Sequence, residues 1–451
     1  MRRMSGIERA GSSPARDPAP GPGPGSALAA PPHPGVERWP ALAPFRTRSF
    51  RYQWPADLIT AWALEMETLI LGWYILVESG SVLMLTVYGA LMFVGTLLSP
   101  LLGTLGDRLG LRRVLATMRL SYALLAGVIL WLAATGRLEP SLVLAVALVV
   151  GLIKPTDIGM RTALVSASVP ANHLVAAMGI SRTTQDSARI GGALAGAGFM
   201  ASFGMVSAYV AITALYLVGA VLTIRSGSAR GAAIRVAVPA ARRASAWRDV
   251  SEGLRYVWHR PPLRAAMMLA ALVNLCAFPL SGGLMPYIAR DVFQLDQQGL
   301  GWLVASFAGG ALIGSIGLSV FGAWLRPART MLLTCVLWHL CLLGLAGPVS
   351  VPVAMALYLG AGLNQSLSMV SLSIILLRNS DDRFRGRVMG ARMLAIYTLP
   401  VGLLAAGALL PVIGFRALVV LYVGLGLLLT AGIAWRWRHV LLPRQAPANT
   451  R

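Results

Sequence analysis

The sequence predicts an all-α membrane protein with twelve transmembrane helices arranged as two halves of six. Three observations lead to this prediction. First, 56% of the 451 residues are hydrophobic and only 12% are charged, whereas soluble domains carry about 25% charged residues. Second, apolar windows long enough to cross a bilayer recur twelve times along the chain. Third, the second set of six windows repeats features of the first.

The apolar windows form two sets, separated by one long internal loop. The first set covers residues 54–77, 83–102, 114–134, 141–161, 183–203 and 205–224, and the second covers 263–288, 300–325, 330–347, 351–377, 388–410 and 413–435. Backbone polar groups inside hydrocarbon must be satisfied within their own segment, so these windows are expected to be helices. No alternating pattern typical of a transmembrane β-barrel is present.

The fifth window of each set, together with the residues just before it in the first set, carries the same pattern. Met178, Gly179, Arg182 and Gly192 in the first set correspond to Met389, Gly390, Arg392 and Gly402 in the second. The Met-Gly pairs are 211 residues apart, and the arginines and the last glycines are 210 apart. Duplicated six-helix halves are typical of secondary transporters, which place a central pathway between the halves.

The distribution of arginine predicts the orientation. The net charge is +22, and every basic residue except Lys154 is an arginine. The arginines gather in the 225–262 loop and in the linkers after the second, eighth and tenth windows, and such positive loops face the cytoplasm. We therefore expect both termini to be cytoplasmic in an inner, or plasma, membrane. Anionic lipid head groups then account for most of the charge, and no nucleic-acid partner is needed.

The segments outside the windows are predicted as follows. Residues 1–49, rich in proline and glycine, are expected to be a disordered tail, and residues 437–451 a second cytoplasmic tail. In the 225–262 linker, Trp247, Val250, Leu254 and Val257 recur at helical spacing. This amphipathic helix lies either on the inner leaflet or against the bundle. The domain boundaries are thus 1–49, 50–224, 225–262, 263–436 and 437–451.

The turn after the second window contains a specific motif, GTLGDRLGLRR, at residues 103–113. Its glycines permit a tight turn, and an aspartate there can meet the positive N-terminus of a helix. The positions that match the GxxxDRxGxRR signature of the major facilitator superfamily are Gly103, Asp107, Arg108, Gly110, Arg112 and Arg113. The chain resembles this family over residues 50–436, which implies the major facilitator fold.

The resemblance implies a role for this turn. Asp107 would latch it to the start of span 11 in the outward-facing state, and release would permit the inward-facing state. The alternative is a loop that only sets orientation.

A narrower resemblance concerns three short segments. RGRV at 385–388, ESGS at 78–81 and RIGGALAG at 189–196 resemble the branch that holds macrolide-type drug exporters and the enterobactin exporter. Drug exporters normally carry a Gly-Pro step in span 5, where this chain has Gly191-Gly192. These glycines, with Gly196, either take part in coupling or allow close helix packing.

Ionisable residues at membrane depth are candidate functional residues. The first window supplies Glu65 and Glu67, which point about 200° apart on a helix, so both cannot line one cavity. Glu65 is preferred as the residue that faces the pathway and carries a proton.

Further charges lie in the fourth and fifth windows. Lys154, Asp157 and Arg161 share one helical face, and they either line the pathway or neutralise one another. Arg189 has Leu399 as its counterpart in the second half, so the repeat does not preserve the charge.

The second half contributes uncharged polar groups, chiefly Asn274, Asn364 and Gln365, which suit an amphipathic ligand or bond their own helix. The predicted function is proton-coupled efflux of an amphipathic drug or siderophore by a monomer. The alternatives are a metabolite importer of the same fold and a receptor or scaffold without transport. No cofactor is expected, Cys276, Cys335 and Cys341 show no metal-ligand spacing, and signatures of membrane enzymes are absent.

Overall fold

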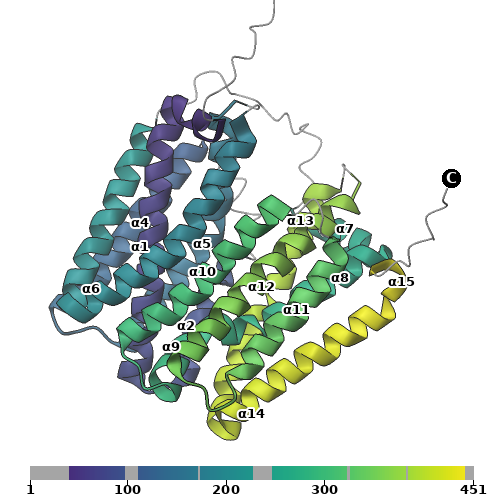
Figure 1. Ribbon diagram of the computed structural model, residues 1–451. Coiled ribbons are helices and arrows are strands. Elements are labelled where there is room, and N and C mark those ends of the chain that lie inside the picture. Colours follow the sequence, from purple (N-terminus) through teal and green to yellow (C-terminus); the bar gives the residue numbers. More distant parts are fainter. Residues whose placement is uncertain are drawn as a thin grey trace, which may run out of the picture. The chain divides into compact units, whose positions relative to one another are not determined.

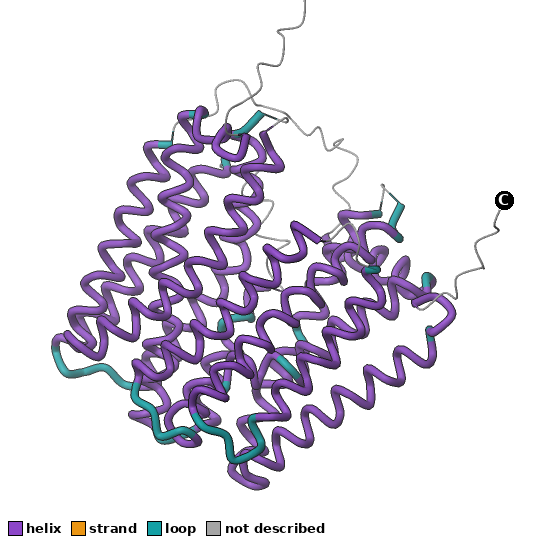
Figure 2. The backbone as a smooth tube through the Cα atoms, viewed as in Figure 1, coloured by secondary structure: helices purple, strands orange, loops and turns teal. Residues whose placement is uncertain are grey.

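The computed structural model describes residues 40–96, 110–170, 173–226, 246–321, 326–381 and 384–441. Every regular element in these ranges is a helix, and no strand occurs among them (Figure 2). The chain divides into a unit of residues 1–39, which contains no described residue, and a unit that begins at Pro40. The second unit alone is described below. The all-α fold predicted from the sequence is confirmed for these ranges.

The helices of the first half lie at the predicted windows, and all but α2 extend beyond them (Figure 1). They are η1 (Pro40–Arg46), α1 (Arg48–Ser79), α2 (Val82–Leu91), η2 (Val94–Thr96), α4 (Leu111–Ala134), α5 (Pro140–Ser168) and α6 (Leu174–Arg225). Gly80 ends α1 with a left-handed φ of 62°, which favours glycine. Ser81 then caps α2 by accepting a hydrogen bond from the Met84 backbone N–H.

The end of the predicted N-terminal tail is ordered. Residues from Pro40 form the short helix η1, and α1 begins at Arg48, so a disordered tail over 1–49 is wrong for its last ten residues. Phe45 packs edge-on against Phe50 and Trp54, with ring centroids 5.1 and 5.2 Å away. This aromatic contact holds η1 against the start of α1. Residues 1–39 of the tail lie outside the described ranges.

The linker and the second half contain more elements, most of them shorter. They are α7 (Ala246–His259), α8 (Pro261–Cys276), η5 (Pro279–Gly283), α9 (Met285–Tyr287), η6 (Ile288–Val292), α10 (Gln297–Phe321), α11 (Pro327–Gly344), α12 (Val351–Arg378), α13 (Arg385–Ile396), α14 (Thr398–Arg436) and α15 (Arg438–Leu441). α8, α11 and α12 each carry proline in the first turn, where its missing N–H costs no hydrogen bond. The elements from α8 to η6 together form the seventh predicted span.

Within the described ranges, nine helices are long and apolar enough to cross a bilayer. Two of these, Ala176–Arg225 and Gly386–Arg436, contain 50 and 51 residues, and one crossing needs about 20. Each turns back at a glycine of left-handed φ, Gly204 at 74° and Gly414 at 78°, so each supplies two predicted spans. The 83–102 window is described only to Thr96, and the twelfth crossing stays a prediction there. The chain is a multi-pass membrane protein.

The packing between the halves follows the predicted repeat. α6 packs against α10, and α2 packs against α14. A Cβ added to Gly301 of α10 would lie 2.6 Å from the Cβ of Ala197, and one added to Gly407 of α14 would collide with Thr86 of α2. Ala197 and Gly407 are 210 residues apart, the offset found in the sequence. The two interfaces are therefore equivalent under the repeat, and a small residue lies at each contact.

The bundle has two ends, which we name by the termini of α1 as the Arg48 end and the Ser79 end. At the Ser79 end, Arg290 of η6 donates a hydrogen bond to the Leu76 carbonyl of α1 at 2.7 Å. This carbonyl also accepts the Gly80 backbone N–H at 3.1 Å, so Arg290 adds a second donor at the end of α1. The two halves are thus tied together at the Ser79 end.

The linker helix α7 packs against the bundle at the Arg48 end, against α13 and α8. Arg387 pairs with Glu252 at 2.9 Å, and Tyr256 stacks on Phe384 at 4.3 Å. Arg260, just after α7, pairs with Asp381 at 2.8 Å. Of the two predicted placements, the structure therefore has the helix against the bundle.

Candidate functional site

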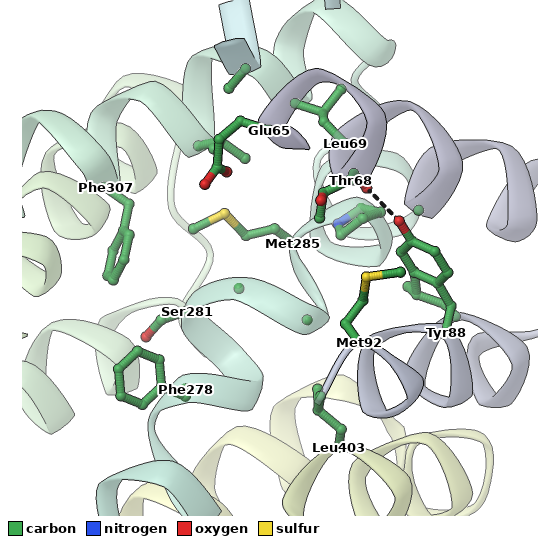
Figure 3. Close-up of a pocket in the computed structure, with 18 of the residues that line it drawn as sticks. Glu65, Thr68, Leu69, Tyr88, Met92, Phe278, Ser281, Met285, Phe307 and Leu403 are labelled. Atoms are coloured by element: carbon green, nitrogen blue, oxygen red, sulfur yellow. Dashed lines mark hydrogen bonds between the residues drawn. The ribbon is translucent and has the colours of Figure 1, made fainter. Parts of the chain in front are cut away.

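A cavity of about 320 Å³ lies between the two halves, and Figure 3 shows residues that line it. α1, α2, α5 and α6 line it from the first half, and the α8–α10 region and α14 from the second. Its walls are mainly apolar and aromatic, with Tyr88, Phe93, Phe278 and Phe307 among the lining residues. Such a lining suits the apolar body of an organic ligand.

The two glutamates of α1 point in different directions. Glu65 lines the cavity, and Figure 3 shows its carboxylate directed toward Met285 of the second half. Glu67 is buried at 4% exposure and accepts a hydrogen bond from the Tyr216 hydroxyl of α6 at 2.7 Å. The sequence left open which of the two glutamates faces the cavity. In the structure, Glu65 faces it and Glu67 packs against a neighbouring helix.

Two basic side chains share the cavity with Glu65. Lys154 comes from α5 and Arg189 from α6. Within the residues that the structure describes, neither cation has a hydrogen-bond or ion-pair partner, and Glu65 has none either. The cavity therefore presents one acid and two bases that do not pair with one another.

Glycines of α6 bring Arg189 and Glu65 into the same cavity. A Cβ added to Gly192 would lie 2.8 Å from the Cβ of Glu65, and one added to Gly196 would lie 2.9 Å from the Cα of Met66. The backbones of α1 and α6 thus touch here, which supports the packing explanation of these glycines. Because Arg189 precedes Gly192 by three residues, it lies on the same face of α6, one turn from the contact.

The equivalent contact in the second half carries no charge. A Cβ added to Gly402 of α14 would collide with the backbone of Leu275 in α8. Gly192 and Gly402 are 210 residues apart, as are Glu65 and Leu275. The repeat therefore replaces the acid by leucine, and it replaces Arg189 by Leu399, which also lines the cavity. The charged wall of the cavity belongs to the first half alone.

The polar residues predicted in the second half lie elsewhere. Asn274, Asn364 and Gln365 are not among the residues that line this cavity. Asn274 and Asn364 are buried and donate to carbonyls of their own helices, at Ala270 and Gly360, both at 2.8 Å. Their part in a substrate pathway stays a prediction.

Asp157 belongs to a separate buried cluster, and the key member of that cluster was missed in the sequence analysis. Arg119 of α4 is fully buried, pairs with Asp57 of α1, and donates to the Thr223 hydroxyl of α6. Arg161 pairs with Asp157 at 2.6 Å and lies 3.8 Å from Asp57. The two carboxylates and the two guanidinium groups of this cluster thus balance in charge. The available signal was an arginine within the 114–134 apolar window.

The turn motif is described only in part. Gly103, Asp107 and Arg108 lie outside the described residues. Gly110 has a left-handed φ of 86° and immediately precedes α4, which begins with Leu111, Arg112 and Arg113. The glycine at this position is needed because other residues rarely adopt that conformation.

Comparisons with known proteins agree with this architecture. Residues 54–399, more than three quarters of the chain, match the profile of the Major Facilitator Superfamily. The chain belongs to this family.

Among curated relatives, the multidrug efflux pump Tap of Mycobacterium tuberculosis is 33% identical over 174 residues, which cover 37% of this chain and 40% of the pump. Tap of Mycolicibacterium fortuitum is 26% identical over 196 residues, or 43% of this chain and 46% of the pump. The chain thus spans less than half of the length of these relatives.

Solved structures share the fold. The nucleoside transporter NupG superposes with a TM-score of 0.67 at 13% identity, over 86% of this chain and 99% of that chain. A bacterial homologue of the iron transporter ferroportin, in an inward-facing state, has a TM-score of 0.65 at 17% identity, over 86% and 98%. At these identities the likeness concerns the fold alone.

Proposed function

We propose that this protein is a secondary transporter, not an enzyme, that exports an amphipathic small molecule by alternating access in exchange for protons. The observation that carries the proposal is the cavity between the two halves, with Glu65 on its wall about midway along α1. Two halves that rock around such a site expose it to each side of the membrane in turn. The partial match to Tap, a multidrug efflux pump, favours export over uptake.

The arginine distribution supports a cytoplasmic Arg48 end and an inner-membrane location with both termini inside. In this orientation the contacts of the Ser79 end, including Arg290 with Leu76, close the cavity toward the outside. The proposed unit is a monomer in the lipid bilayer, and it needs no cofactor.

Glu65 is the proposed proton carrier. Its carboxyl group lines the cavity without a protein partner, so proton and substrate compete for it. Glu67 is tied to Tyr216 away from the cavity and is proposed to have a structural role only.

The turn motif from Gly103 to Arg113 is proposed to be the conformational switch. Asp107→Asn is expected to slow the exchange between states, and therefore transport, without loss of expression.

The test uses cells with and without the gene and three fluorescent amphipaths: ethidium, fluorescein and rhodamine B. Export predicts that at least one dye accumulates less in cells with the protein, and that a protonophore abolishes the difference. Purified protein in proteoliposomes should then release protons from an acidic lumen when that dye is supplied outside.

Glu65→Gln is expected to abolish proton release, and Glu67→Gln, the matched control on the same helix, to retain it. Greater accumulation in cells with the protein would instead support the importer. The absence of both dye and proton flux would support a scaffold and overturn the proposal.

A further inference from the structure

We propose that the cavity binds amphipathic zwitterions, molecules that carry an ammonium group and an oxyanion on one apolar body. This inference rests on the proposed function, because it names the substrate class of the same site. It depends on the charges of the cavity wall and not on the direction of transport.

The charged groups of the wall lie at similar depth. Glu65 is 17 residues from the start of α1, Lys154 is 14 from the start of α5, and Arg189 is 15 from the start of α6. At a rise of 1.5 Å per residue, these positions lie about 21–26 Å along their helices, close to the middle of a crossing. One ligand of modest length can therefore reach all three.

Charges of both signs at this depth need partners, because hydrocarbon does not solvate them. Elsewhere in the first half, two buried arginines form salt bridges with buried aspartates: Arg119 with Asp57, and Arg161 with Asp157. At the cavity, by contrast, the described part of the chain provides no hydrogen bond or salt bridge to any of the three groups, and only Lys154 has an opposite charge, that of Glu67, within electrostatic reach. The ligand is the remaining source of a counter-charge for Glu65 and for Arg189.

The chemistry of each group assigns the contacts. The guanidinium of Arg189 presents a planar fork that matches a carboxylate or a similar oxyanion, and Lys154 adds a second positive charge. Glu65 accepts hydrogen bonds from an ammonium group. The second half offers Phe278, Met285 and Phe307 to the apolar body.

A zwitterion fits this wall better than a simple cation or anion. A cation would leave Arg189 unpaired, and an anion would leave Glu65 unpaired. The zwitterion is also compatible with exchange for a proton, because its ammonium group competes with the proton for Glu65 while its oxyanion stays bound to the two bases.

The test compares three ligands with one fluorescent body, bound to the purified full-length protein in lipid nanodiscs without a proton gradient. The zwitterion is Nε-dansyl-lysine, the anion is dansyl-6-aminohexanoate, and the cation is dansylcadaverine. We expect the zwitterion to bind at least tenfold more tightly than either of the others, because each charge-assisted contact contributes about tenfold or more.

Variants assign each contact. Arg189→Gln is expected to weaken the binding of the zwitterion and of the anion about tenfold. The binding of the cation should be unchanged or tighter. Glu65→Gln is expected to weaken the binding of the zwitterion and of the cation and to leave the binding of the anion unchanged. Arg189→Lys, which keeps the charge, should recover most of the anion affinity and so separates charge from folding. Arg182→Gln is the matched control, since Arg182 lies on the same helix, is 59% exposed and pairs with Asp186.

Equal or tighter binding of the cation, with no effect of Arg189→Gln, would overturn the inference. So would the absence of binding of all three ligands. Because binding is measured without a gradient, the inference can fail while proton-linked transport of another amphipath stands. Equally, selective zwitterion binding without any flux would uphold the inference and count against the transporter.

Discussion

Removal of Asp57 is expected to destabilise the first half strongly. Asp57 and Asp157 balance Arg119 and Arg161 in one buried cluster. Asp57→Asn keeps the shape but leaves a net charge of +1 beside Arg119, whose side chain is 0% exposed, so water cannot replace the lost carboxylate. Breaking a buried pair in this way costs about 3–5 kcal/mol.

The expected loss can be measured as a shift in melting temperature. Unfolding entropy is about 2.1 cal/mol/K per residue, or about 0.95 kcal/mol/K over 451 residues. The melting temperature of Asp57→Asn in detergent should therefore fall by about 3–5 °C. The assay is thermal denaturation of the purified protein followed by thiol-reactive fluorescence, since Cys276 and Cys335 are buried and free.

A double-mutant cycle tests the electrostatic reason. Asp57→Asn with Arg119→Gln removes one charge of each sign, so the double variant should be more stable than the sum of the single losses by about 1 kcal/mol or more. Asp381→Asn is the control, because its pair with Arg260 is exposed, and its melting temperature should not change. A wild-type melting temperature for Asp57→Asn, or strictly additive losses in the cycle, would refute the reasoning.

Three further predictions concern packing, pH and the closed end. Gly192→Ala should lower the melting temperature, because its Cβ would press on α1, whereas Gly198→Ala, with nothing within 4 Å, should preserve or raise it. Hydrogen bonds from Tyr256 and Arg260 lower the pKa of Asp381 below its ordinary 3.8, so its contribution to α7 docking is present above that pH and lost as the pH falls through the lower folded-state value. The measurement is hydrogen exchange of α7 relative to the intrinsic rate at each pH. Protection should fall in acid in the wild type, and this change should be absent in Asp381→Asn. Arg290→Gln should loosen the Ser79 end, measured as faster labelling of a cysteine placed at Ser79, and unchanged labelling would contradict a role of the Arg290–Leu76 contact in holding the two halves together.

Much of the fold was predictable because a bilayer restricts the possible structures. Apolar windows of about 20 residues can only be helices there, and a described helix lies at each predicted window, although α2 and α11 end before their windows do. The predicted end of the disordered tail was wrong. Whether Phe45 packs on Phe50 and Trp54 depends on side-chain geometry that composition does not contain.

The candidate site was predictable only in part. Glu65, Lys154 and Arg189 were recognised because charge is rare in apolar windows, and the structure places all three around one cavity. Arg119 carried the same signal and was overlooked, although it forms the centre of the buried charge cluster.

The sequence by itself determined where the helices lie and roughly how many there are, because both follow from hydropathy. It also determined the repeat and the distribution of arginines, which follow from spacing and charge along the chain. Only the tertiary structure decided which charge meets which. Glu65 and Glu67 are two residues apart and chemically alike, yet one faces the cavity and the other meets Tyr216. That difference depends on how α6 lies against α1, which the glycine contacts between the two helices set.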